Sequence, residues 1–150
     1  MSGVVVVDTS IVVKWVLYEP DSATALALLT KWFRDGLEIH APALLMYELA
    51  NVLHQHVRRG EETPDSAKQA LAKVFFVDLQ LDFPSDTTLS MRAIELAHQY
   101  ALPATYDAHY LALAERENCE YWTADTRLWN ALRGKLPWVR WLGDYHPASP

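Results

Sequence analysis

The sequence feature that most constrains the fold is a run of four valines, Val4–Val7, that ends directly at Asp8. Branched side chains of this kind favour β-strands, and an uninterrupted apolar run is typical of a strand that is buried on both faces. Strands buried on both faces belong to parallel sheets that helices cover on either side. We therefore expect Val4–Val7 to be a fully buried strand of an α/β protein.

Short apolar segments alternate with helical segments along the rest of the chain. We predict further strands at Glu38–Ala41, Val77–Leu81, Glu120–Thr123 and Trp138–Leu142. We predict helices over residues 9–17, 22–34, 42–59 (with Pro42 at the first position), 63–76, from Ser85 or Asp86 to 100, 105–118 and 126–133. This alternation predicts a three-layer α/β/α sandwich with a central, mostly parallel five-stranded sheet.

The organisation of the chain is expected to be simple. Its 150 residues suffice for one ordinary domain, so we expect residues 1–150 to form a single unit with 146–150 as a loose C-terminal tail. The helix over residues 22–34 is expected to bury Leu26, Leu29 and Phe33. In sheets of this class, ligands bind beyond the carboxyl ends of the strands, near the point where the strand order reverses.

Four acidic residues occupy positions where a solvated carboxylate is not the natural choice. Asp8 follows the first strand, Asp125 follows the strand Glu120–Thr123, and Asp107 stands at the start of a helix. Glu48 interrupts the apolar face of its helix. Clustered carboxylates repel one another and resist ionising together, and hard cations such as Mg²⁺ and Mn²⁺ relieve that repulsion. The sequence therefore predicts a metal site with phosphodiester chemistry.

Each of these acids also has an ordinary structural explanation. Asp8 and Asp125 could cap the helices that follow them, and Asp107 could favour the positive end of its helix. Glu48 is harder to explain, because an unpaired carboxylate on an apolar face is costly. Asn51 lies one turn beyond Glu48 and could orient it, or it could simply lie on the helix surface. The conjunction of four such acids is what favours a functional site.

Four segments of the chain resemble the successive motifs of the PIN-domain ribonucleases, and in particular the toxin subunits of VapBC toxin–antitoxin pairs. These segments are Val6–Ser10, Tyr47–Leu53, Tyr106–Ala114 and Trp122–Leu128. The four acidic positions of the family match Asp8, Glu48, Asp107 and Asp125, and its hydroxyl positions match Ser10 and Thr123.

The resemblance implies a metal-dependent endoribonuclease that hydrolyses RNA with water activated by Mg²⁺, for which Mn²⁺ can substitute. Asp8, Asp107 and Asp125 would bind the cation directly or through water, and Glu48 would complete the shell or position the attacking water. Ser10 and Thr123 would hydrogen-bond water, phosphate or a ligand carboxylate. Relatives of this type often cleave structured RNA such as tRNA.

Two partners are expected besides RNA. The resemblance implies a homodimer and a cognate antitoxin whose extended tail crosses the active-site groove. Large apolar side chains at Trp32, Phe75-Phe76 and Trp138/Trp141 give modest support to a dimer interface, because exposed apolar patches generally mark interfaces.

Bulk properties bound the function further. The net charge of −6 disfavours non-specific nucleic-acid binding, although Lys14, the pair Arg58-Arg59 and the set Arg127, Arg133, Lys135 and Arg140 could still contact phosphates. A single cysteine, Cys119, cannot form an internal disulfide, and no signal peptide or membrane span is visible, so a cytoplasmic location is expected.

Two other functions stay open at this point. One is a PIN module that binds RNA or protein without catalysis. The other is a different Mg²⁺-dependent phosphoryl-transfer enzyme, although such enzymes usually carry a paired Asp-x-Asp after the first strand. Here Thr9 and Ser10 follow Asp8, which disfavours that class.

Overall fold

The computed structural model describes residues 3–148, in which five strands form one parallel sheet. The strands are β1 (Val4–Val7), β2 (Glu38–Pro42), β3 (Leu79–Asp82), β4 (Glu120–Thr123) and β5 (Val139–Trp141). Their order across the sheet is β3-β2-β1-β4-β5. The central position of β1 explains its composition, since three of its four valines are buried.

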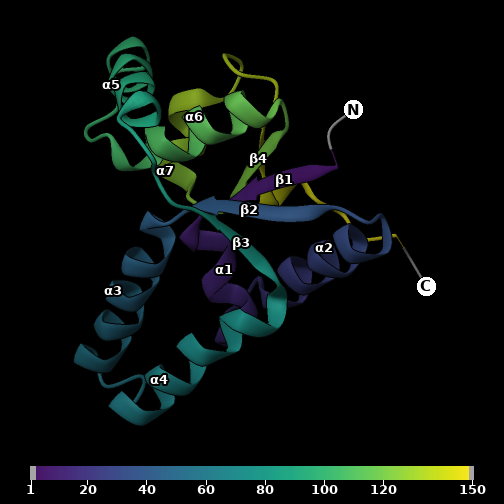
Figure 1. The fold of residues 1–150 in the computed structure, drawn as a ribbon. Helices are drawn as coiled ribbons and strands as arrows, with labels where there is room; N and C mark the ends of the chain where they lie inside the picture. Colours follow the sequence, from purple (N-terminus) through teal and green to yellow (C-terminus); the bar gives the residue numbers. More distant parts are fainter. Residues whose placement is uncertain (1–2, 149–150) are drawn as a thin grey trace.

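Helices cover both faces of the sheet. They are α1 (Thr9–Val16), α2 (Ser22–Arg34), α3 (Leu44–Arg58), α4 (Pro64–Lys73), α5 (Thr88–Gln99), α6 (Tyr106–Glu117) and α7 (Thr126–Leu132). Figure 1 shows α1 to α4 on one side of the sheet and α5 to α7 on the other. The predicted three-layer arrangement is therefore confirmed.

The strand order reverses between β1 and β4. The chain runs outward from β1 through β2 to β3, then crosses the opposite face and returns to place β4 beside β1. Val7 pairs with Trp122, so Asp8 and Thr123 both follow this last pair of the ladder. The carboxyl ends of these two strands therefore form the crevice in which folds of this class bind ligands.

Some predicted boundaries are wrong. Pro42 does not open a helix: it ends β2, opposite Asp82, and α3 begins two residues later. The helix predicted from Ser85 or Asp86 begins at Thr88, whose N–H donates 2.9 Å to the side chain of Asp86. The helix predicted to reach residue 76 ends at Lys73 and continues as a short 3₁₀ helix, Val74–Val77.

The second helix buries only one of the three residues predicted for the core, Leu29. Leu26 and Phe33 are 44% and 51% exposed, whereas Trp32 is buried. The indole of Trp32 packs edge-on against Trp15 and Trp122, with ring centroids 6.2 and 6.1 Å away. The buried face of α2 therefore runs through Leu28, Leu29 and Trp32.

This packing changes the surface expected at a dimer interface. Trp32 lies in the core and cannot take part, while Phe75 and Phe76 are 79% and 87% exposed.

At the C-terminus, Tyr145 packs edge-on against Trp122, and the chain beyond it continues outside any helix or strand to Ala148. The last two residues of the predicted tail, 149 and 150, lie outside the described residues.

Candidate active site

The four predicted acids line one cavity of about 330 Å³ at the carboxyl ends of β1 and β4. Asp8 follows β1, Asp125 follows β4, Asp107 lies in the first turn of α6 and Glu48 lies in α3. The helices α1 and α7 begin directly after these strand ends, and α6 begins beside Asp107. Their positive ends partly offset the negative charge of the carboxylates.

Asp8 is the most firmly held of the four acids. Its Oδ1 accepts hydrogen bonds from the backbone N–H of Ser10, at 3.0 Å, and from the Ser10 hydroxyl. Its Oδ2 accepts from Tyr121 at 2.6 Å and from Thr123 at 2.5 Å. These four donors hold the carboxylate in one orientation, in which Asp8 still lines the cavity.

Burial and hydrogen bonding act on Asp8 in opposite directions. Burial raises the pKa of its carboxyl group, and the nearby charge of Asp125 raises it further. The hydroxyls of Ser10, Thr123 and Tyr121 lower the pKa because they donate to the charged form. The net direction is upward. The bond from the Ser10 N–H also makes Asp8 the cap of α1, as its structural explanation predicted.

Ser10 and Thr123 bind the two strand ends to each other. Their hydroxyl oxygens lie 3.3 Å apart, and each also accepts a backbone N–H. Ala124 donates to Ser10 at 2.7 Å, and Asp125 donates to Thr123 at 3.1 Å. Both predicted hydroxyl residues therefore contact the carboxylate of Asp8 while they fix the backbone that leads into α7.

Glu48 is half-buried and is held by a residue that the sequence did not suggest. Tyr110 donates its hydroxyl to Oε1 of Glu48 over 2.6 Å. The predicted contact from Asn51 is not formed among the described residues, because Asn51 is exposed on the outer face of α3. Burial raises the pKa of Glu48, the Tyr110 hydroxyl lowers it, and the charge of Asp8 raises it.

Asp107 and Asp125 complete the acidic lining. Burial, together with the charges of the other three acids, raises the pKa of Asp107 to about 6. Asp125 caps α7, with Oδ1 accepting from the N–H groups of Arg127 at 2.9 Å and Leu128 at 3.4 Å. The raised pKa of Asp107 is the direct consequence of crowding carboxylates into one partly desolvated cavity.

Sequence reasoning missed the two tyrosines that hold these acids. Tyr110 and Tyr121 are fully buried, and their rings stack with centroids 5.8 Å apart and planes 15° apart. Each hydroxyl reaches a different acid, Glu48 and Asp8 respectively. A signal was available: a tyrosine within an apolar segment needs a hydrogen-bond partner once it is buried.

The donor chemistry of the cavity fits a hard divalent cation. Carboxylate oxygens are the ligands that Mg²⁺ and Mn²⁺ prefer, and a cation would offset both the burial and the acidic neighbours that raise the pKa of Asp107. Within residues 3–148, no three His, Cys, Asp or Glu side chains converge tightly enough to form a finished metal cage. Uncompensated carboxylates repel, so an open arrangement is expected before a cation draws them together or binds them through water.

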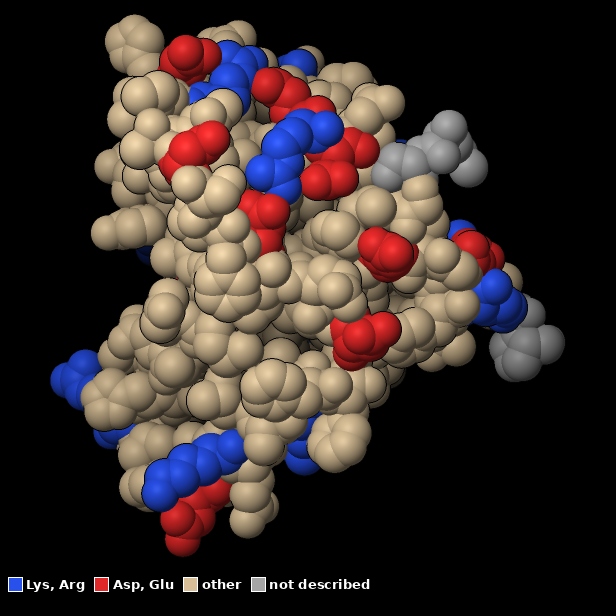
Figure 2. All heavy atoms as spheres, in the orientation of Figure 1, with Lys and Arg blue, Asp and Glu red and all other residues tan. Residues whose placement is uncertain are grey.

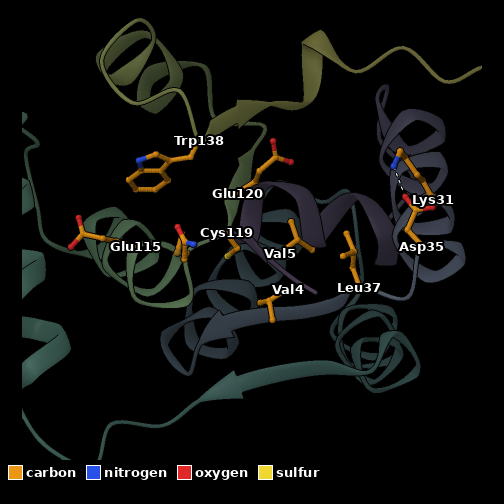
Figure 3. Close-up of a pocket in the computed structure, with 11 residues that line it drawn as sticks. Val4, Val5, Lys31, Asp35, Leu37, Glu115, Cys119, Glu120 and Trp138 are labelled. Carbon is orange, nitrogen blue, oxygen red and sulfur yellow. Dashed lines mark hydrogen bonds and ion pairs between the residues drawn. The ribbon is translucent and has the colours of Figure 1, made fainter. Parts of the chain in front are cut away.

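A larger cavity, of about 690 Å³, lies at the opposite edge of the sheet (Figure 3). Its walls include Val4, Leu37 and Trp138, and its charged groups include the ion pair between Lys31 and Asp35. The thiol of Cys119 also lines it, but burial raises its pKa to about 11, so it is not a nucleophile at neutral pH. Size alone therefore does not identify the site, and the chemistry favours the acidic cavity.

The comparisons with known proteins agree with this assignment of fold. The sequence model of the PIN domain family matches residues 5–134. The protein named Ribonuclease VapC3 from Pyrobaculum aerophilum is 32% identical over 125 residues, which cover 82% of this chain and 90% of that protein. The crystal structure of PAE2754 from Pyrobaculum aerophilum aligns with a TM-score of 0.64 at 22% identity, covering 93% of this chain and 83% of the other. Across residues 3–148, no helix combines the length and apolar character that a bilayer crossing demands.

Proposed function

This chain belongs to the PIN domain family, and we propose that it is a metal-dependent endoribonuclease that acts as the toxin of a toxin–antitoxin pair. The observation that carries the proposal is the set of four carboxylates around one cavity, with Asp8 fixed by four hydrogen-bond donors. The similarity to a protein named Ribonuclease VapC3 supports RNA as the substrate class. Action on RNA in the cytoplasm is part of the proposal.

The cation would be Mg²⁺, with Mn²⁺ as a substitute, held by Asp8, Asp107 and Asp125 directly or through water. When bound, it would supply positive charge to the scissile phosphate and lower the pKa of the attacking water. Asp8 is the fixed element of this set, because its donors leave it a single orientation. Burial and the acidic neighbours raise the pKa of Asp107, so a bound cation would favour its charged form.

Glu48 would orient or deprotonate the attacking water. Its carboxylate lines the cavity, and Tyr110 occupies Oε1, which leaves Oε2 for another partner. Burial raises its pKa, which makes it a better base than an exposed glutamate. Attack by water on the phosphorus would leave a 5′-phosphate and a 3′-hydroxyl, and this route needs no ribose 2′-hydroxyl as nucleophile.

Partners form a second part of the proposal. We expect a homodimer, for which the exposed pair Phe75 and Phe76 gives the apolar surface. We also expect a cognate antitoxin whose basic side chain would enter the acidic cavity and pair with its carboxylates. Structured RNA such as tRNA is the expected substrate.

RNA cleavage by the purified protein tests the activity. We expect cleavage with Mg²⁺ or Mn²⁺, none with EDTA, and a large loss for Asp107→Asn. Asp65→Asn is the matched control, because Asp65 lies in the first turn of another helix with its side chain 89% exposed. Cleavage by Asp107→Asn at the wild-type rate would show that the active site is assigned wrongly.

Thermal unfolding with and without Mg²⁺ provides a readout that is independent of activity. A ligand that binds only the folded state stabilises it by about 2.7 kcal/mol at a hundredfold excess over Kd. The stabilisation should fall in Asp107→Asn and persist in Asp65→Asn. A protein that binds Mg²⁺ and RNA but cleaves no RNA would instead be a non-catalytic PIN module.

A further inference from the structure

One positively charged side chain lines the same cavity as the four acids. Lys14 is the only Lys or Arg among the described residues that line it. It follows Ser10 by four positions on α1, so the two side chains lie on the same face of that helix about 6 Å apart along its axis. Ser10 contacts Asp8, and Lys14 therefore lies one helical turn from the centre of the site.

Lys14 is held at the rim by a single acid. Its Nζ lies 3.0 Å from Oε2 of Glu19, and the two side chains are only 13% and 20% exposed. The other oxygen of Glu19 lies 3.7 Å from Nε2 of His56 on α3. Glu19 also lines the cavity, so it contacts groups from two helices and pairs with the ammonium there.

A structural role for this ion pair is weak, because the loop that carries Glu19 is fixed without it. The hydroxyl of Ser22 accepts from the Glu19 N–H at 2.8 Å and donates to the Leu17 carbonyl at 3.0 Å. The Ser22 N–H also donates to the Glu19 carbonyl at 3.0 Å. These bonds close the turn between α1 and α2, so Lys14 is not needed to hold it.

Other basic side chains lie on the surface, but among the described residues only Lys14 brings a positive charge into the lining of the acidic cavity. On the face drawn in Figure 2, several Lys and Arg side chains lie beside Asp or Glu side chains. Several of the paired residues are Arg59 with Glu61, Arg92 with Glu115 and Arg116 with Asp82. A polyanion that enters an acidic cavity needs at least one cation fixed at the entrance.

Resting on the proposed function, we propose that Lys14 binds an RNA phosphate adjacent to the scissile one, and that Glu19 is the counter-ion this phosphate displaces. Lys14 would then set how the RNA strand lies along α1, while the four acids act on the next phosphate. Glu19 would lower the affinity for RNA, because the phosphate must replace an existing partner of the ammonium.

The test measures binding of a fluorescent single-stranded RNA in EDTA, where no cleavage occurs, across a series of salt concentrations. Each phosphate contact on a single strand contributes about 0.7 to the slope of log K against log salt. Lys14→Gln should lower the slope by about that amount, and Lys14→Arg should restore it. Lys68→Gln is the control, since Lys68 is exposed and lies 3.8 Å from its own acid on α4.

Glu19→Gln should have the opposite effect on RNA binding. Because it frees the Lys14 ammonium from a partly exposed ion pair, it should tighten RNA binding about two- to fivefold. The double variant Lys14→Gln/Glu19→Gln should lose that gain, because the coupling acts through Lys14. In Mg²⁺, Lys14→Gln should raise KM about tenfold with kcat nearly unchanged.

Two results would overturn the inference. One is a Lys14→Gln variant with the wild-type salt slope and KM but a lowered thermal midpoint, which would make the ion pair structural only. The other is a Glu19→Gln variant with unchanged or weaker RNA binding. If the proposed function itself is wrong, the wild-type protein will cleave no RNA in Mg²⁺ or Mn²⁺. That result differs from both of the above, because it does not depend on how RNA binding varies with salt.

Discussion

The hydroxyl of Tyr121 donates a 2.6 Å hydrogen bond to Oδ2 of Asp8, which joins the interior of β4 to the residue that ends β1. Tyr121 is fully buried and Asp8 is 5% exposed. A buried carboxylate is costly unless donors satisfy it. Four donors gathered around one acid therefore indicate that the position of Asp8 is fixed by the fold before any ligand arrives.

Removal of the Tyr121 hydroxyl should weaken the fold in a pH-dependent way. Tyr121→Phe keeps the ring and its stacking on Tyr110 but deletes one donor to the Asp8 carboxylate. We expect the free energy of unfolding to fall by about 1.5–3 kcal/mol at neutral pH. The pKa of Asp8 should rise further, so the loss should shrink as pH falls and Asp8 becomes protonated.

Urea denaturation of Tyr121→Phe at neutral and acidic pH measures this effect. Tyr18→Phe is the matched control, because Tyr18 is 95% exposed. An equal loss at both pH values would mean that packing, rather than the bond to Asp8, accounts for the change.

Asp107→Asn should stabilise the protein in the absence of metal. The pKa of Asp107 is about 6 in the folded state against an ordinary value of 3.8, so between these values the folded state holds more protons than the unfolded state. Stability therefore falls as pH rises from about 4 to 6, and the cost is full above 6. Asparagine carries no charge, so Asp107→Asn should raise the free energy of unfolding by roughly 1 kcal/mol after allowance for solvent screening. The thermal midpoint should rise by about 2–4 °C.

Thermal unfolding of Asp107→Asn in EDTA across that pH range is the measurement. The gain over wild type should be present at neutral pH and should vanish below about pH 4, where both states of the wild-type protein are protonated. A melting point below that of the metal-free wild type at neutral pH would favour a purely structural role at the start of α6.

Asp8→Asn should behave differently, although it is the same chemical change. An amide has one acceptor oxygen and a donor NH₂ group, and at this position the NH₂ would face hydroxyl or N–H donors on one side. Unsatisfied buried groups cost about 1–3 kcal/mol each. We expect a lower thermal midpoint for Asp8→Asn, in contrast to the gain in Asp107→Asn, together with loss of RNA cleavage in both. Matched midpoints for the two variants would contradict the hydrogen-bond network around Asp8.

Inhibition by an antitoxin should depend on the metal. A basic side chain in the cavity and a divalent cation would compete for the same carboxylate oxygens. We expect inhibition of RNA cleavage to weaken as Mg²⁺ rises, which a titration with the copurified partner measures. Inhibition that is indifferent to Mg²⁺ would mean that the partner blocks RNA elsewhere.

Sedimentation of the isolated protein would separately test the dimer, since a monomer at micromolar concentration contradicts it.

The local pattern of the sequence determined much of the fold. It predicted β1 and β4 at their observed bounds, Val4–Val7 and Glu120–Thr123, and it predicted the alternation that makes a parallel sheet with helices on both faces. It also singled out the acids at strand and helix ends, because a carboxylate that follows an apolar strand stands out in the chain. These are short-range signals, read from side-chain spacing within one segment.

The tertiary structure alone decided which groups touch the acids. Tyr121 and Asp8 are 113 residues apart, Tyr110 and Glu48 are 62 apart, and no local pattern indicates that they meet. The sequence suggested Asn51 for Glu48, but its direction on α3 places it in solvent. It likewise chose Leu26 and Phe33 for the core, whereas Trp32 fills the space between Trp15 and Trp122. Such choices depend on the shape of neighbouring elements, so they exist only once the sheet and its helices have packed.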